Sequence, residues 1–134
     1  MEARALVVDD DQLFLRLLEL NLAKIGIKVY TAPSGREALR LAAAEKPDII
    51  LLDIMMPGMD GYEVLRQLKA SGETRDIPII MLTAKSGMED RARCREMGAE
   101  AYITKPFKLE ELRETVKRLI FPGGKPGCNG SSRR

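Results

Sequence analysis

The sequence contains no histidine and no tryptophan, and only two of its 134 residues are cysteine. Without histidine, neither a Ser-His-Asp triad nor a Cys-His pair can be built. Cys94 and Cys128 do not form a CxxC motif, and no histidine is present to complete a zinc site. We therefore interpret both cysteines as free thiols.

Long apolar runs are also missing. No run approaches the roughly 20 residues that cross a bilayer, and residues 1–4 lead into a short apolar segment rather than a signal peptide. We therefore expect a cytoplasmic protein without membrane contact. Aromatic residues make up only 4% of the chain, whereas hydrophobic residues make up 45%. This composition is typical of one compact domain with an aliphatic core.

The net charge of +2 is unevenly distributed. Residues 122–134 contain Lys125, Arg133 and Arg134 and no acid, so residues 1–121 carry one more acidic than basic side chain. The predicted domain, 1–121, therefore has no net positive field, and we expect no direct nucleic acid binding. Residues 122–134 are rich in Gly, Pro and Ser, which predicts a flexible tail or linker.

Short apolar segments alternate with segments of helical periodicity along the chain. Strands are predicted over 5–8, 27–31, 49–52, 77–82 and 101–104, and helices over 12–25, 35–45, 61–71, 87–97 and 109–120. Ser34 and Asp60 are placed to cap the second and third helices. Strict alternation implies right-handed crossovers and a parallel sheet with helices on both faces. The fold class is therefore α/β and doubly wound.

Polar side chains follow four of the predicted strands at their carboxyl ends. They are Asp9, Asp10 and Asp11 after the first strand, Asp53 after the third, Thr83 after the fourth and Lys105 after the fifth. In a parallel sheet these ends share one edge, where ligands bind. Clustered carboxylates repel each other, and Mg²⁺ relieves that repulsion. A nearby ammonium and hydroxyl suit phosphoryl oxygens, and Asp53 is placed as a nucleophile that forms an acyl phosphate.

Each of these features alone has a simpler explanation. The acids 9–11 could cap a helix and favour its dipole, and Asp53 could cap a turn. Thr83 is an ordinary residue at a strand end, and Lys105 alone is usually a solvated charge. Their conjunction, each at a strand end, favours a phosphoryl site over four unrelated features.

Residues 3–121 resemble the receiver domain of two-component response regulators, in the superfamily of the chemotaxis regulator. The segments that carry the resemblance are LVVDDD at 6–11, PDIILLDIMMPGMDGYEVL at 47–65, IPIIMLTA at 77–84 and GAEAYITKPF at 98–107. The resemblance implies a flavodoxin-like fold, with a five-stranded parallel sheet in the order 2-1-3-4-5 and five helices on both faces.

The resemblance also implies a phosphoacceptor and a metal site. Asp53 matches the aspartate that is phosphorylated in the family. Asp10 would bind Mg²⁺ directly, Asp9 would act on it largely through water, and the main-chain carbonyl of Met55 would complete the protein ligands. Met55 cannot orient a water molecule, so we expect a longer-lived phosphorylated state than in fast-resetting chemotaxis regulators.

Three further residues match the family's switch. Thr83 corresponds to the hydroxyl that moves to bond the phosphoryl group, and Lys105 to the lysine that pairs with it. Tyr102 corresponds to the aromatic residue that moves inward on activation. Pro106 follows Lys105, and the family usually makes this peptide bond cis.

The implied function is acceptance of a phosphoryl group by Asp53 from a histidine kinase or phosphotransfer protein, with Mg²⁺. The domain would phosphorylate and dephosphorylate only itself and would not be a turnover enzyme.

The helix over 87–97 has few apolar residues, so we expect it to form, with the last strand and last helix, the face that controls an output domain or target protein. A monomer or a phosphorylation-dependent dimer is expected. Arg91, Glu111 and Lys117 match only part of the charge set of dimeric DNA-binding regulators.

The sequence is compatible with other interpretations. One alternative is a stand-alone phosphorelay adaptor without an output domain, and another is one module of a longer regulator. A haloacid-dehalogenase-type phosphatase also uses an aspartyl nucleophile, but it needs a second aspartate where this chain has Met55. A flavodoxin-like carrier of FMN would need a Ser/Thr/Gly-rich loop in place of the acids at 9–11.

Overall fold

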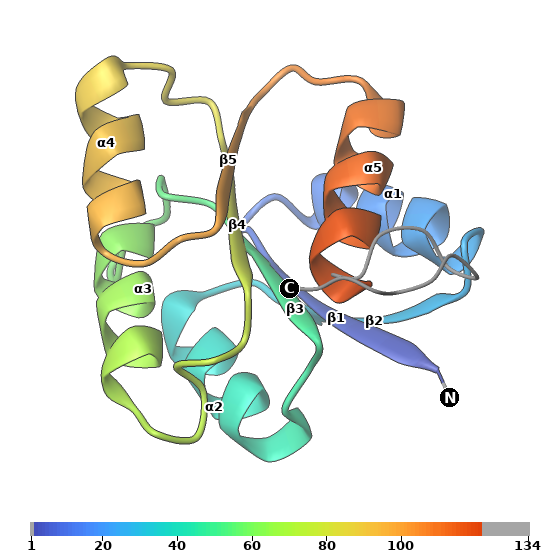
Figure 1. The fold of residues 1–134 in the computed structure, drawn as a ribbon, viewed down its shortest axis with the longest axis horizontal. Helices are drawn as coiled ribbons and strands as arrows, with labels where there is room; N and C mark the ends of the chain where they lie inside the picture. The colour runs from blue at the N-terminus through green and yellow to red at the C-terminus, as the bar shows by residue number, and fades with distance from the viewer. Residues whose placement is uncertain (1, 122–134) are drawn as a thin grey trace.

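The computed structural model describes residues 2–121 and contains five strands and five helices in strict alternation (Figure 1). The strands are β1 (Ala3–Val8), β2 (Ile27–Ala32), β3 (Ile49–Leu52), β4 (Ile79–Thr83) and β5 (Ala101–Thr104). The helices are α1 (Gln12–Ala23), α2 (Gly35–Glu45), α3 (Gly61–Ala70), α4 (Met88–Glu96) and α5 (Leu109–Ile120). The predicted tail, 122–134, lies outside the described residues.

All strand pairs are parallel, and the order in the sheet is β2-β1-β3-β4-β5. This confirms the predicted fold class. Figure 1 shows α1 and α5 on one face of the sheet and α2, α3 and α4 on the other. All four residues of β3 and all five of β4 are buried, as expected for strands covered on both faces.

The two faces of the sheet have separate aliphatic cores. Alternate residues of each strand point to opposite faces, so Ile50 and Leu52 pack with α2 and α3, whereas Ile49 and Leu51 pack with α1 and α5. The apolar residues of α5 lie at helical spacing, which predicts that they share one face of the helix. This is confirmed, because Leu112 and Val116 are buried and Leu109, Leu119 and Ile120 pack against the same core.

Helix caps follow the sequence signals. Ser34 Oγ accepts a hydrogen bond from the Glu37 amide, and an Asp60 carboxylate oxygen accepts one from the Glu63 amide. The fourth predicted strand begins later than expected, at Ile79 instead of Ile77, because Pro78 has no amide hydrogen to donate to the sheet.

Leu13, Leu17 and Leu18 lie at helical spacing in the sequence, which predicts that they share the buried face of α1, but this is wrong for two of them. Leu13 is 82% exposed and Leu17 is 45% exposed, whereas Leu15, Leu18 and Leu22 are buried. The helix also ends at Ala23 rather than at residue 25. Leucines surround this helix on nearly every side, so periodicity alone does not select the side that packs on the sheet.

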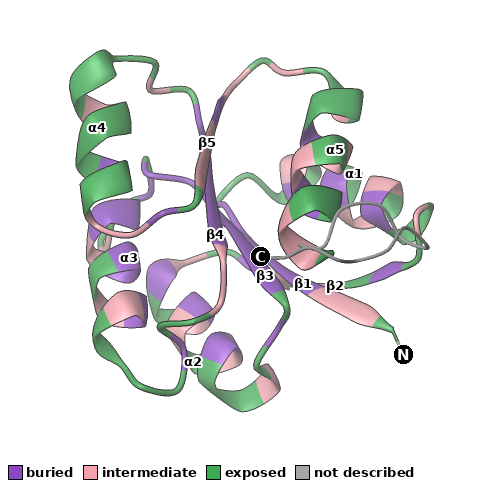
Figure 2. Cartoon of the chain, viewed as in Figure 1, coloured by how far each residue is buried: buried purple, intermediate pink, exposed green. Residues whose placement is uncertain are grey.

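Helix α4 is thinly packed, as expected. Cys94 is its only buried residue, and Met88 at its start is 85% exposed. Figure 2 shows α4 exposed along most of its length. Gly87 occupies its N-cap position and supplies no side-chain hydrogen bond.

A lysine joins the end of α3 to the starts of β4 and β5. The Lys69 ammonium donates to the carbonyls of Arg75 and Ile77 at 3.1 and 3.3 Å, and lies 3.2 Å from Glu100 Oε2. Glu100 Oε1 in turn accepts a 2.7 Å hydrogen bond from the Ile79 amide. We call Lys69 and Glu100, with these backbone partners, the Lys69 clamp.

Within residues 2–121, no helix is both long enough and apolar enough to cross a membrane.

Candidate phosphoryl and metal site

The carboxyl ends of β1, β3, β4 and β5 bring together the residues predicted from the sequence. Asp9 follows β1, Asp53 follows β3, Thr83 ends β4 and Lys105 follows β5. Asp9 is 2% exposed and Asp53 is 6% exposed, and Thr83 is fully buried. Burial of a carboxylate destabilises the folded state unless the carboxylate is paired with a positive charge or with hydrogen bond donors. The partners of Asp9 and Asp53 therefore indicate what the site can bind.

Both carboxylate oxygens of Asp9 have partners. Oδ1 accepts a 2.9 Å hydrogen bond from the Asp11 amide, and Oδ2 lies 2.6 Å from the Lys105 ammonium. Asp11 itself caps α1 by accepting hydrogen bonds from the amides of Leu13 and Phe14. The alternative reading of the acidic run therefore holds for Asp11, whereas Asp9 points into the site.

Asp53 is held by the loop that follows it. Its Oδ1 accepts a 3.1 Å hydrogen bond from the Met55 amide, and its Oδ2 lies 3.7 Å from the Lys105 ammonium. Burial raises the pKa of Asp53, while the Met55 amide, the Thr83 hydroxyl and the Lys105 charge act in the opposite direction. The Lys105 ammonium is thus paired with two buried carboxylates, those of Asp9 and Asp53.

Gly61 allows α3 to begin directly against this site. A Cβ atom at residue 61 would lie 2.2 Å from the main-chain oxygen of Asp53 and 2.6 Å from the Cα of Ile54. No side chain can be accommodated at that separation without moving the backbone. The glycine therefore allows the end of β3 and the start of α3 to approach closely.

Three carboxylates could hold a metal ion. One oxygen from each of Asp9, Asp10 and Asp53 lies within 4.8 Å of the others. Asp10 is exposed, so the cluster opens to solvent on its side. An all-oxygen set with room for water suits Mg²⁺, which keeps several waters when bound to proteins.

Thr83 is connected to Tyr102 through Lys85. The Lys85 amide lies 3.4 Å from the Thr83 hydroxyl oxygen, and the Lys85 carbonyl accepts a 2.7 Å hydrogen bond from the Tyr102 hydroxyl. Burial is the main cause that raises the pKa of Tyr102, to about 12, so its hydroxyl remains a donor at neutral pH. The predicted cis bond between Lys105 and Pro106 is present.

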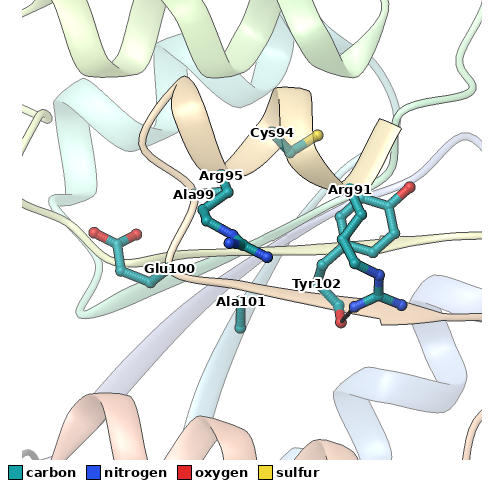
Figure 3. Close-up of a pocket in the computed structure, with 7 residues that line it drawn as sticks. All are labelled: Arg91, Cys94, Arg95, Ala99, Glu100, Ala101 and Tyr102. Atoms are coloured by element: carbon teal, nitrogen blue, oxygen red, sulfur yellow. Dashed lines mark hydrogen bonds between the residues drawn. The ribbon is translucent and has the colours of Figure 1, made fainter. Parts of the chain in front are cut away.

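Arg91 covers Tyr102 from α4. Its guanidinium donates to the Tyr102 carbonyl and to the Thr104 hydroxyl, both at 3.3 Å, and lies 4.8 Å from the centre of the Tyr102 ring. Figure 3 shows this contact at one end of a pocket between α4 and β5. Arg91, one of the charges considered for a dimer, is thus engaged within its own chain.

Two contacts near the site were not foreseen from the sequence. The Lys105 ammonium lies 4.0 Å from the centre of the Phe14 ring, a cation–π contact from α1. Tyr62 on α3 donates a hydrogen bond to Asp90 on α4. Phe14, Tyr62 and Asp90 lie on helices and not at strand ends, so only the packing of the helices reveals these contacts.

Sequence comparison gives one family. The pattern of the response regulator receiver domain matches residues 5–117. The response regulator MprA of Mycolicibacterium vanbaalenii is 44% identical over 120 residues, which cover 90% of this chain and 51% of that protein. The chain spans about half the length of the curated relatives it matches.

Comparison with solved structures leads to the same family. The chemotaxis protein CheY4 of Vibrio cholerae superposes with a TM-score of 0.84 at 33% identity, covering 89% of this chain and 99% of that one. The receiver domain of the sensor histidine kinase PA1611 of Pseudomonas aeruginosa superposes with a TM-score of 0.82 at 34% identity, covering 90% and 98%. That structure has a magnesium ion coordinated in its active site cleft.

Proposed function

The chain belongs to the response regulator receiver domain family of two-component signalling, and we propose that Asp53 is its phosphoacceptor. The observation that carries this proposal is the pairing of one ammonium, that of Lys105, with two buried carboxylates at the carboxyl edge of the sheet. A buried carboxylate beside an ammonium group can accept a phosphoryl group and keep its added charge compensated.

In the proposed reaction, a carboxylate oxygen of Asp53 attacks the phosphorus of a phosphohistidine. The new bond joins oxygen to phosphorus, the bond from phosphorus to the imidazole nitrogen breaks, and the product is an acyl phosphate. The Met55 amide holds Oδ1 of Asp53, and Lys105 faces Oδ2, so the carboxylate is oriented before the donor arrives. Mg²⁺ held by Asp9, Asp10 and Asp53, with the main-chain carbonyl of Met55 as a further ligand, would neutralise the charge of the transferring group.

Thr83 and Lys105 are the residues that would respond to the phosphoryl group on Asp53. We infer that the Thr83 hydroxyl bonds the phosphoryl group and that Lys105 pairs with it. Movement of Thr83 would disturb the Lys85 amide and, through the Lys85 carbonyl, the hydroxyl of Tyr102. The face formed by α4, β5 and α5 would then change toward an output domain or target protein.

The domain would donate its phosphoryl group only to water or to a partner, so we propose no turnover of a separate substrate. A histidine kinase or a phosphotransfer protein is the proposed donor in the cytoplasm. Because the relatives it matches are about twice as long, we favour action within a longer regulator over action as a stand-alone adaptor. A dehalogenase-type phosphatase is disfavoured, since Met55 offers no second catalytic carboxylate.

Labelling by acetyl phosphate tests the assignment. We expect intact-mass spectrometry to show one added phosphoryl group in the presence of Mg²⁺ and none with a chelator. Asp53→Ala should abolish the added mass, whereas Asp76→Ala, which removes an exposed loop carboxylate, should not. Labelling of Asp53→Ala at the wild-type rate would contradict the proposal.

A further inference from the structure

A polar contact joins α3 to α4 outside the predicted switch. The Tyr62 hydroxyl on α3 donates to a carboxylate oxygen of Asp90 on α4, and the Arg93 guanidinium lies 3.7 Å from the centre of the Tyr62 ring. Tyr62 is only 9% exposed, and burial is the main cause that raises its pKa above the ordinary tyrosine value. The hydroxyl is therefore a permanent donor at neutral pH.

This contact is important because α4 has few apolar contacts to hold it. Its only buried side chain is that of Cys94, and its first turn has no side-chain cap. Asp90 and Arg93 both reach Tyr62 from that helix. A hydrogen bond to a charged acceptor shifts a conformational equilibrium by about tenfold or more, which is a large effect for a helix with so few apolar contacts.

The same carboxylate also contacts the segment that follows β4. Asp90 Oδ2 lies 3.9 Å from the Lys85 ammonium, while its other oxygen accepts from Tyr62. The Lys85 amide lies beside the Thr83 hydroxyl. Asp90 therefore stands between the strand end that carries Thr83 and the start of α3, and a displacement of the loop after β4 reaches it directly.

We propose that the Tyr62–Asp90 hydrogen bond is a latch that fixes α4 to α3 and opposes the rearrangement of α4 that accompanies phosphorylation. The second part rests on the proposed function of Asp53. If the latch stabilises one position of α4, weakening it favours the other position and, by linkage, favours phosphorylation of Asp53 by the same factor. Tyr62 acts here as a positioning residue, because it touches neither Asp53 nor its metal cluster.

Hydrogen exchange without any phosphodonor tests the latch itself. In Tyr62→Phe the ring and its stacking with Arg93 remain, and only the hydroxyl is lost. We expect the amides of residues 88–96 to exchange about tenfold faster than in the wild type. Tyr30→Phe is the matched control, since the Tyr30 hydroxyl has no hydrogen bond partner within residues 2–121. Unchanged exchange over 88–96 in Tyr62→Phe would overturn the latch.

The rate of labelling by acetyl phosphate and Mg²⁺ tests the connection to Asp53. We expect Tyr62→Phe to be labelled several times faster than the wild type and Tyr30→Phe to match the wild type. Faster exchange with an unchanged labelling rate would overturn the connection. If even the wild type were not labelled, the function proposed for Asp53 would fail, and the exchange experiment would still decide whether the latch exists.

Discussion

The ammonium of Lys105 lies 2.6 Å from Oδ2 of Asp9, closer than the 3.7 Å that separates it from Asp53. Since the Asp11 amide holds the other oxygen of Asp9, this carboxylate already has a partner on each side. Exposed Asp10 has more freedom to contact a metal ion directly. The arrangement supports the proposal that Asp10 is a direct ligand and that Asp9 acts largely through water.

The two acids should therefore differ in their effect on Mg²⁺. We expect Asp10→Asn to raise the Mg²⁺ concentration for half-maximal labelling more than Asp9→Asn does. Loss of an outer ligand typically weakens metal binding by about 10- to 100-fold, which is the range expected for Asp9→Asn. Glu73→Gln, which removes an exposed carboxylate far from the cluster in sequence, is the control. A larger effect for Asp9→Asn than for Asp10→Asn would reverse the assignment of the two roles.

Gly61→Ala should disrupt the site and the fold together. Its new methyl group would meet the main chain at Asp53 and Ile54, which cannot move without shifting β3. We expect a loss of about 3 kcal/mol in the free energy of unfolding, at the upper end for overpacking, together with slower labelling of Asp53. Urea denaturation measures the first effect.

Gly72→Ala is the matched control for that substitution, because a Cβ at Gly72 has no atom within 4 Å. Its free energy of unfolding should stay within about 0.5 kcal/mol of the wild type. Equal stability of the two variants would show that the approach of α3 to β3 is looser than described.

The lifetime of the phosphorylated state should depend on Met55. Its side chain is 55% exposed and lines the mouth of a cleft with Tyr62 and Lys85. A thioether is a weak acceptor and orients water poorly, so Met55→Asn should shorten the half-life by at least about tenfold by positioning the attacking water. Loss of label after removal of the donor measures it, with Met88→Asn on exposed α4 as control. A wild-type half-life of only seconds would contradict the expected long lifetime.

Cys94 should be nearly inert while α4 stays in place. Its thiol is fully buried, and burial, followed by the charge of Asp90, raises its pKa to about 11. At pH 8 its thiolate fraction is about 100-fold below that of an ordinary cysteine. In a Cys128→Ser background, we expect alkylation by iodoacetamide at least about 100-fold slower in the native protein than in urea. A native rate close to that in urea would mean that α4 opens freely.

Much of the fold could be predicted because the strands are short apolar runs and two helices carry capping residues in the sequence. Ser34 and Asp60 mark helix starts that the structure confirms. The buried face of α1 could not be predicted, since Leu13 and Leu15 are equally apolar and only the position of the sheet decides which is covered.

The clustering of Asp9, Asp53, Thr83 and Lys105 could be predicted for a topological reason. Parallel strands end at the same edge of a sheet, so residues that follow them must meet. The contact between Tyr62 and Asp90 had no comparable signal, because the two residues lie 28 positions apart on separate helices. Their meeting depends on how α3 and α4 pack, which no local pattern specifies.

The Lys69 clamp has a mechanical consequence for α4. It holds Glu100 and the beginning of β5 to the end of α3, so the chain that leaves α4 at its C-terminal end is anchored. The opposite end follows Gly87 and begins with exposed Met88. Rotation of α4 about its anchored end would displace Met88 most and Met97 least. A partner that senses the angle of this helix would therefore gain the largest signal by contacting its first turn.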